Sequence, residues 1–288
     1  MSEAPDGTDA ESSRPEVISS AVLRIGGPSP GFAEDRLVRE EPLEVRLRDT
    51  AVAVLMRTPG HDEELACGFV VTEGVVARGD VRFASHCRTV PLEARGNVIN
   101  VMIPDRVAFD PEAWQRNTLA SSACGVCGKA TLDRLFVRAD PLMPLARPLG
   151  PEEIGAAMAA MRAQQAVFDQ TGGLHAAGLF DLRRGRLVVV REDVGRHNTV
   201  DKVIGWAALQ RRLPLSDHLL VVSGRAGFEI VQKAWVAGIP ALASVSAPSS
   251  LAVAMAQRAG MVLVGFVRGD RMNVYAGAEH TRQSDAAP

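Results

Sequence analysis

The chain has 288 residues, of which 47% are hydrophobic and 23% are charged. These values are typical of a soluble globular protein and exclude a largely disordered one. The 32 basic and 34 acidic residues leave a net charge of −2, so no bulk basic field attracts nucleic acid or an anionic membrane. The acidic start, residues 1–16, lacks the basic and apolar segments of a secretion signal. We therefore expect a cytoplasmic protein without nucleic-acid or membrane partners.

The N-terminal half predicts a disordered acidic tail over residues 1–16 and an α+β domain over 17–116. Residues 17–57 have β character, and the continuously apolar stretch 51–56 indicates a buried strand. A helix pattern begins at Asp62 and is expected to end at Gly74. Two further strands are predicted at 81–87 and 98–103, and Cys67 and Cys87 are expected to be core residues of this domain.

The C-terminal half predicts an α/β sandwich over residues 151–277, after a loop, short helix and Pro-rich linker at 117–150. A helix is expected over 152–168 and a β-hairpin over 175–192. Helices and strands then alternate, which favours a largely parallel sheet. The predicted helices are 197–209, 228–236 and 249–259, the strands are 219–223, 241–245, 262–267 and 272–275, and residues 278–288 are expected to be frayed.

Two cysteines three positions apart, Cys124 and Cys127, stand in a stretch of small residues just before the predicted short helix. At a helix start, a thiolate gains from free backbone N–H groups and the helix dipole, and Lys129 adds a nearby cation. The pattern indicates a reactive thiol pair. The alternatives are half of a zinc site or two inert thiols.

A zinc deaminase is a further alternative, because His61 and Glu63 form an H-x-E pattern. However, Ala123 replaces the proline that precedes the first cysteine in such enzymes, and no second C-x-x-C pair exists. We expect no bound metal.

Turns after two apolar strands could bind an anion. Ser223, Gly224 and Arg225 join a strand to a helix, where glycine lets the backbone approach a ligand and the helix start favours negative charge. The second turn, Phe266-Val267-Arg268-Gly269-Asp270-Arg271, carries two arginines that suit a phosphate or a guanine edge. Each could equally be a plain tight turn.

A third polar segment, Glu192 to Asn198, lies between a predicted strand and a helix. Asp193 could cap that helix, while His197 and Asn198 could line a pocket. His175, at the start of a strand, is more simply a histidine satisfied by neighbouring groups.

Several stretches, in order along the chain, resemble the FdhD/NarQ family of formate dehydrogenase accessory sulfurtransferases. The matching segments are Arg57-Thr58-Pro59, Glu64 to Phe69, Thr72-Glu73-Gly74, Ser122 to Gly128, Thr171 to His175, Glu192 to Asn198 with Asp201-Lys202, Val222 to Arg225, and Phe266 to Arg271. The resemblance implies a cytidine-deaminase-like three-layer α/β/α core without the deaminase zinc chemistry.

It also implies that a cysteine desulfurase loads a persulfide on Cys124, with Cys127 as the second thiol. The sulfur would pass to the molybdenum or tungsten bis-guanine-dinucleotide cofactor, bound as substrate at Phe266–Arg271 with no permanent cofactor, before formate dehydrogenase receives it. We expect a homodimer with the desulfurase and the formate dehydrogenase catalytic subunit as partners. A thiol–disulfide oxidoreductase and a cofactor chaperone that moves no sulfur remain alternatives.

Overall fold

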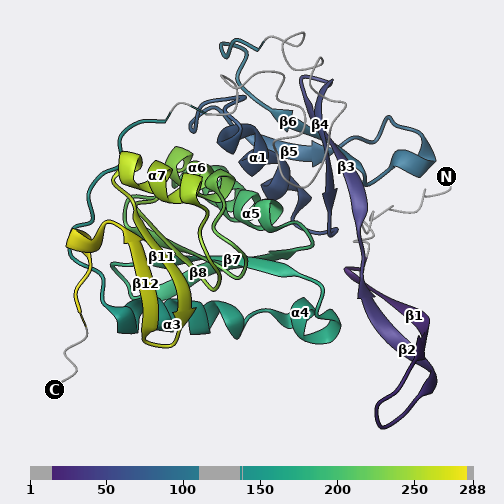
Figure 1. Cartoon of the computed structure of the whole chain (residues 1–288). Coiled ribbons are helices and arrows are strands. Elements are labelled where there is room, and N and C mark those ends of the chain that lie inside the picture. Colours follow the sequence, from purple (N-terminus) through teal and green to yellow (C-terminus); the bar gives the residue numbers. More distant parts are fainter. Residues whose placement is uncertain (1–14, 110–136, 138, 284–288) are drawn as a thin grey trace, which may run out of the picture.

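The structure is a computed structural model that describes residues 15–109, 137 and 139–283. These residues form a six-stranded sheet, a four-stranded sheet and a separate two-stranded arm (Figure 1). No helix among them is long and apolar enough to cross a membrane.

The six-stranded sheet has the order β12-β11-β10-β9-β7-β8. The β9–β10 and β10–β11 pairs are parallel, whereas the β7–β8, β7–β9 and β11–β12 pairs are antiparallel. The expectation of a largely parallel sheet is therefore wrong, because both edges are closed by tight hairpins, and such short turns join only antiparallel strands. The strands are β7 (His175–Asp181), β8 (Arg186–Asp193), β9 (His218–Val222), β10 (Ala241–Ser244), β11 (Val262–Arg268) and β12 (Arg271–Ala276).

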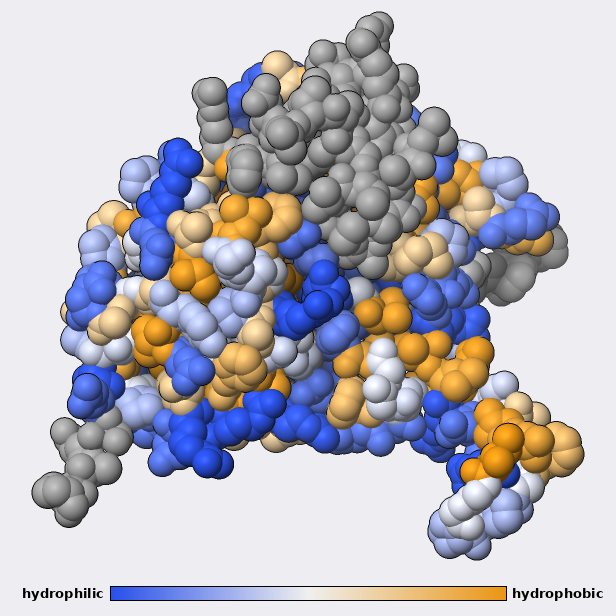
Figure 2. Space-filling view, viewed as in Figure 1, coloured by the Kyte–Doolittle hydropathy of each residue, from blue (hydrophilic) through white to orange (hydrophobic). Residues whose placement is uncertain are grey.

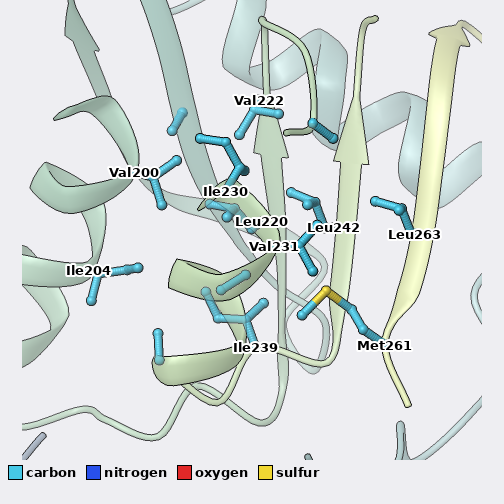
Figure 3. Packing of buried hydrophobic residues seen from close by; sticks show 14 of the residues in the cluster. Val200, Ile204, Leu220, Val222, Ile230, Val231, Ile239, Leu242, Met261 and Leu263 are labelled. Carbon is cyan, nitrogen blue, oxygen red and sulfur yellow. The ribbon is translucent and has the colours of Figure 1, made fainter. Parts of the chain in front are cut away.

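Helices cover both faces of this sheet, which confirms the three-layer α/β/α arrangement (Figure 1). The period of two along β9 divides its side chains: Leu220 and Val222 face one core, and Leu219 and Val221 face the other. Figure 3 shows the first core, in which Val200 and Ile204 face the strands across Ile230. That face holds α5 (Arg196–Leu209), α6 (Phe228–Val236) and α7 (Ser250–Ala259), and the opposite face holds α3 (Pro151–Arg162) and α4 (Ala166–Thr171).

The helix expected over 152–168 is in fact two helices, because α3 ends at Arg162 and α4 begins at Ala166. The Glu192 carboxylate of β8 accepts the backbone N–H groups of Val167 (3.0 Å) and Phe168 (2.8 Å). These N–H groups stand at the start of α4 and have no partner inside that helix. A tertiary contact therefore stabilises a new helix start inside the predicted helix.

The four-stranded sheet has the order β4-β3-β6-β5 and packs against α1. Its core is formed by apolar side chains such as Leu43, Leu65 and Ile99. The face of α1 that is turned away from this sheet packs against α5, which covers the six-stranded sheet. Helices therefore lie between the two sheets (Figure 1). The elements are β3 (Glu41–Leu47), β4 (Thr50–Arg57), α1 (Asp62–Thr72), β5 (Phe83–His86) and β6 (Val98–Met102), with short 3-10 turns at η1 (Leu92–Ala94) and η3 (Ala278–His280).

The β region expected over 17–57 is divided between this sheet and the arm. The arm consists of β1 (Val17–Arg24) and β2 (Gly31–Val38), which among the described strands pair only with each other and project from the rest of the molecule (Figure 1).

Two further expectations are wrong in detail. Cys67 is fully buried, as expected, but Cys87 is partly exposed because it follows the last residue of an edge strand. The segment after Gly277 is not frayed as far as Arg282, since Thr281 forms a bridge with Leu149 and Arg282 N–H donates to the Leu149 carbonyl (2.9 Å).

Candidate functional site

The cysteines Cys124 and Cys127, and the short helix expected over 129–136, lie outside the described residues. The residues that flank this segment are placed. Phe109 packs against the core of the four-stranded sheet, as does Val137. The N–H of Val137 also donates to the Gln232 side chain of α6 (3.0 Å). The residues on both sides of this segment, Phe109 and Val137, therefore lie against the N-terminal core, and Val137 also contacts α6.

The predicted turn Ser223–Arg225 lies at the carboxyl edge of the parallel strands, as expected. Ser223 bonds to Ala176 of β7 through both its N–H (2.9 Å) and its hydroxyl, which accepts the Ala176 N–H (2.8 Å). A Cβ added to Gly224 would lie 3.3 Å from Nδ1 of His175. Glycine therefore allows the turn to pass close to the imidazole, and Arg225 is left exposed.

The loop between β10 and α7 joins this turn to the end of β11. The Ser244 hydroxyl donates to the Gly224 carbonyl (2.6 Å), and the Phe266 N–H donates to the Ser246 carbonyl (3.2 Å). Arg268 Nη1 donates to the Val245 carbonyl (2.6 Å). The sheet edge thus brings both predicted turns to one connected loop surface, with the residues after β10 between them.

Phe266 has a φ of +54°, which is uncommon for a bulky side chain. The pairing of β11 with β12 shifts register between Gly265 and Arg268, so Phe266 lies in a bulge and its side chain is 45% exposed. Bulges commonly re-aim side chains beside functional sites. An exposed aromatic ring held out by strained backbone could stack on a planar ligand group.

The tip of the second turn lies elsewhere. The Gly269 carbonyl packs against Gly155 of α3, where an added Cβ would be only 2.5 Å from it. Arg271, which pairs with Arg268 across the hairpin, is exposed. The segment 266–271 is therefore divided: its first three residues join the sheet edge, and its tip lies against the helix layer on the opposite face.

Positive charge gathers around His175. Burial lowers the pKa of this imidazole, and the nearby guanidinium groups of Arg196 and Arg225 lower it further. Arg196 begins α5, and its Nε is buried without a hydrogen-bond partner in the described part of the chain. The edge therefore brings the His175 imidazole close to the guanidinium groups of Arg196 and Arg225, and a bound anion would satisfy both arginines.

Asp193 lies close to these cations but is already paired. Its carboxylate is 2.7 Å from Lys202 Nζ, accepts the Asn198 side chain (2.8 Å), and is fully buried. The helix N-cap is Gly195, so the expectation that Asp193 caps α5 is wrong. Asn198 also donates to the Met56 carbonyl (2.8 Å), which places it in the interface with β4, not in a pocket. His197, the other expected pocket residue, is also buried.

The family model for the FdhD/NarQ family matches residues 38–282. The chain belongs to the FdhD/NarQ family. A relative from Streptomyces coelicolor named "Sulfur carrier protein FdhD" is 49% identical over 265 residues, covering 90% of this chain and 93% of the relative. A relative of the same name from Mycolicibacterium paratuberculosis is 49% identical over 256 residues, covering 85% of this chain and 91% of the relative.

A solved structure described as a formate dehydrogenase accessory protein from Desulfotalea psychrophila has the same fold. It superposes with a TM-score of 0.74 at 27% identity, covering 93% of this chain and all of the other.

Many residues of the FdhD/NarQ motifs are used for packing in this chain. Thr58 N–H donates to Asp193 (3.2 Å), and the Thr72 hydroxyl donates to Asp201 (2.7 Å). These bonds join the N-terminal unit to α5 and β8. Sequence reasoning did not assign His175 and Arg196 to the same site as Arg225. Their juxtaposition depends on the antiparallel course of β7 and β8, which returns both to the carboxyl edge of β9.

Proposed function

We propose that this FdhD/NarQ chain is a sulfur carrier that accepts a persulfide on Cys124 and delivers its sulfur to a guanine-dinucleotide form of the molybdenum or tungsten cofactor for formate dehydrogenase. The observation that carries the proposal is the Cys124-Gly125-Val126-Cys127 pair in a chain about half identical to proteins named sulfur carriers. The donor would be a cysteine desulfurase, and the protein would act in the cytoplasm.

Loading is a thiol exchange. The Cys124 thiolate attacks the outer sulfur of the desulfurase persulfide, and the desulfurase cysteine leaves as a thiolate. No net oxidation occurs, because one sulfur–sulfur bond forms as another breaks. The attacking thiol must be ionised and accessible.

Delivery requires two electrons if the sulfur leaves as sulfide. Attack of Cys127 on the inner sulfur of the Cys124 persulfide supplies them: a Cys124–Cys127 disulfide forms and hydrosulfide leaves toward the cofactor. A thiol reductant then restores both cysteines. Cys127 thus assists release and is not needed for loading.

The cofactor is a substrate with phosphates and guanine rings, and the edge of the six-stranded sheet offers complementary groups. The guanidinium groups of Arg196 and Arg225 lie near His175, and Phe266 presents an exposed ring. Guanidinium groups pair well with phosphates, and a ring can stack on a base. The arginines and the exposed Phe266 ring support placing the dinucleotide along Ser223–Arg225 and Phe266–Arg271.

The test is intact mass spectrometry and bound radiolabelled sulfur after incubation with a desulfurase and cysteine. Wild type should gain one sulfur that a reductant removes. Cys124→Ser should gain none, whereas Cys127→Ser should load fully but transfer slowly. Label on Cys124→Ser and none on Cys127→Ser would reverse the two roles. Full formate dehydrogenase activity in cells carrying the double variant would exclude sulfur transfer and favour the chaperone alternative.

A further inference from the structure

Two buried clusters of the same composition join the N-terminal unit to the C-terminal unit. Each consists of a threonine that donates to an aspartate, and of a lysine that pairs with that aspartate. All six residues are at most 3% exposed: Thr72, Asp201 and Lys233 in one cluster, and Thr58, Asp193 and Lys202 in the other. The clusters differ in what they support, because only the second holds the turn that leads into α5.

This turn is bonded to Thr58 of the N-terminal unit. The Thr58 hydroxyl accepts the Val194 N–H (3.2 Å), and the Thr58 N–H donates to the Asp193 carboxylate (3.2 Å). The same carboxylate accepts the Gly195 N–H (2.8 Å). The two N–H groups immediately before Arg196 are therefore bonded to Thr58 and Asp193, and these bonds fix the direction in which the chain enters α5.

Lys202 completes the cluster from within α5. Its Nζ lies 2.7 Å from the Asp193 carboxylate and donates to the carbonyls of Thr58 (3.1 Å) and Glu192 (3.3 Å). Buried charges are tolerated when they are paired and hydrogen-bonded, and both charges of this cluster meet that condition. The turn is thus anchored to both units.

Arg196, the first residue of α5, lies at the edge of the six-stranded sheet. A Cβ added to Gly224 would be 3.3 Å from Nδ1 of His175 and 3.7 Å from Cβ of Arg196, so Gly224 lies against both residues. The buried Arg196 Nε has no hydrogen-bond partner in the described part of the chain, which is unfavourable for a donor. Burial, and after it the Arg196 charge, lower the pKa of His175. The position of Arg196 therefore affects the charge of this edge.

We propose that Thr58 and Asp193 are positioning residues, which hold the turn before α5 so that Arg196 can bind an anion at the edge of the six-stranded sheet. The N-terminal unit thereby shapes a binding site whose residues His175, Arg196 and Arg225 belong to the C-terminal unit. The identity of the anion as a guanine nucleotide rests on the proposed function, whereas the positioning of Arg196 does not.

This support is buried, so its variants leave the surface of the molecule unchanged. The arm presents exposed apolar side chains such as Phe32, visible as orange groups in Figure 2, whereas Thr58 is 1% exposed. Valine has nearly the shape of threonine but no hydroxyl, so Thr58→Val leaves the Val194 N–H without its acceptor. Thr58→Ser keeps the hydroxyl. A difference between these two variants therefore reports the bond to the turn.

Isothermal titration calorimetry with GDP tests the positioning through affinity. Arg196→Ala should weaken binding at least about tenfold, and Thr58→Val about threefold or more. Thr58→Ser should bind within about twofold of wild type. Adding Thr58→Val to Arg196→Ala should cause no further loss, because Thr58 acts through Arg196. A further loss in the double variant, or equal GDP affinity of Thr58→Val and wild type, overturns the proposal.

The other cluster supplies matched controls. The Thr72 hydroxyl donates to Asp201 (2.7 Å), and their lysine lies in the last turn of α6, away from the turn that precedes this helix. Thr72→Val and Asp201→Asn should lower the free energy of unfolding in urea yet bind GDP as wild type does. Asp193→Asn leaves one acceptor oxygen where the carboxylate uses two, and should weaken GDP binding as Thr58→Val does. Equal loss of affinity in both clusters would indicate a general effect of stability and overturn the proposal.

A measurement without nucleotide separates this inference from the proposed function. Thr58→Val changes no charge, so a rise in the His175 pKa toward its ordinary value of 6.5 would report that Arg196 has moved away. Proton NMR titration should show this rise in Thr58→Val and Arg196→Ala, and not in Thr72→Val. An unchanged His175 pKa in Thr58→Val overturns the positioning even if GDP binds. A raised His175 pKa in Thr58→Val, together with no GDP binding by wild type, would support the positioning and reject the nucleotide.

Discussion

Gly68 of α1 and Gly205 of α5 each lie against the backbone of the other helix. A Cβ on Gly68 would be 1.8 Å from the Asp201 carbonyl oxygen, and one on Gly205 would be 1.7 Å from the Glu64 carbonyl oxygen. Both distances are far below van der Waals contact, so the two helices cross at a separation that only glycine permits. This crossing holds the N-terminal unit against the helices that cover the six-stranded sheet.

Gly205→Ala should therefore separate α1 from α5. We expect it to lower the free energy of unfolding by about 3 kcal/mol or more, at the upper end for overpacking of a core. Urea denaturation monitored by circular dichroism would measure the loss. Gly79→Ala is the control: nothing lies within 4 Å of its added Cβ, so its effect should stay within about 0.5 kcal/mol. Equal stability of the two variants would contradict the close crossing.

The second prediction concerns the buried cluster beside this crossing. Lys233 of α6 lies 2.9 Å from carboxylate oxygens of both Asp201 and Glu73, which raise its pKa, and both Lys233 and Asp201 are buried. Lys233→Met leaves two carboxylates without a counter-ion and should cost about 3–5 kcal/mol. Asp201→Asn leaves the lysine paired with Glu73 and should cost clearly less. Urea denaturation of both variants at one pH measures the difference.

The same cluster gives a pH dependence with a defined sign. Burial raises the pKa of Asp201 to about 6 from its usual value near 3.8, although Lys233 opposes this. The folded state then binds more protons than the unfolded state between these pH values, so stability from this group is present at low pH and is lost as pH rises through 6. Removing Lys233 should strengthen the effect. Lys233→Met should lose more stability between pH 5 and pH 8 than wild type, as urea denaturation would show. A free energy of unfolding of Lys233→Met that does not change between pH 5 and pH 8 would contradict this prediction.

The third prediction concerns His175. Burial and the neighbouring cations of Arg196 and Arg225 lower its pKa. The folded state therefore binds fewer protons than the unfolded state, and stability from this group is complete above pH 6.5 and falls as pH decreases below it. A bound phosphate should offset the arginine charges and raise the His175 pKa. Proton NMR titration of the His175 imidazole with and without GDP would show the change. In the protein without GDP, Arg225→Ala should raise the pKa of His175. An unchanged titration in GDP would place the phosphates elsewhere.

The fourth prediction concerns nucleotide binding at the sheet edge. Each charge-assisted hydrogen bond to a phosphate is worth roughly 1.5–3 kcal/mol, so Arg225→Ala and Arg268→Ala should each weaken GDP binding at least about tenfold. Isothermal titration calorimetry measures this. Arg258→Ala is the matched control. It also removes an exposed arginine, but Arg258 lies in the last turn of α7, whereas the loop at the proposed site precedes the first turn of that helix. Equal affinity for GDP and ADP, or no loss in either variant, would exclude a guanine-specific site here.

The sequence by itself determined the order of most elements. Apolar periodicity located α5, α6 and α7 and the parallel strands between them, because a period near four and a continuous apolar run are local properties of buried helices and strands. The same reading located the turns after β9 and within the β11–β12 hairpin. The cysteine pair and its motif neighbours pointed to the family by identity of residues alone.

Only the tertiary structure decided how these pieces combine. The Glu192 carboxylate divides a predicted helix, because helix ends depend on partners for free N–H groups that a distant strand can supply. Asp193, which the sequence suggested as a helix cap, is buried with Lys202, and Asp201 is buried with Lys233. His175 joins Arg196 and Arg225 only because β7 runs antiparallel to β9 and β8 runs antiparallel to β7. Sequence patterns report which face of an element is buried, whereas the pairing of charges and the direction of strands depend on contacts between residues far apart in the chain.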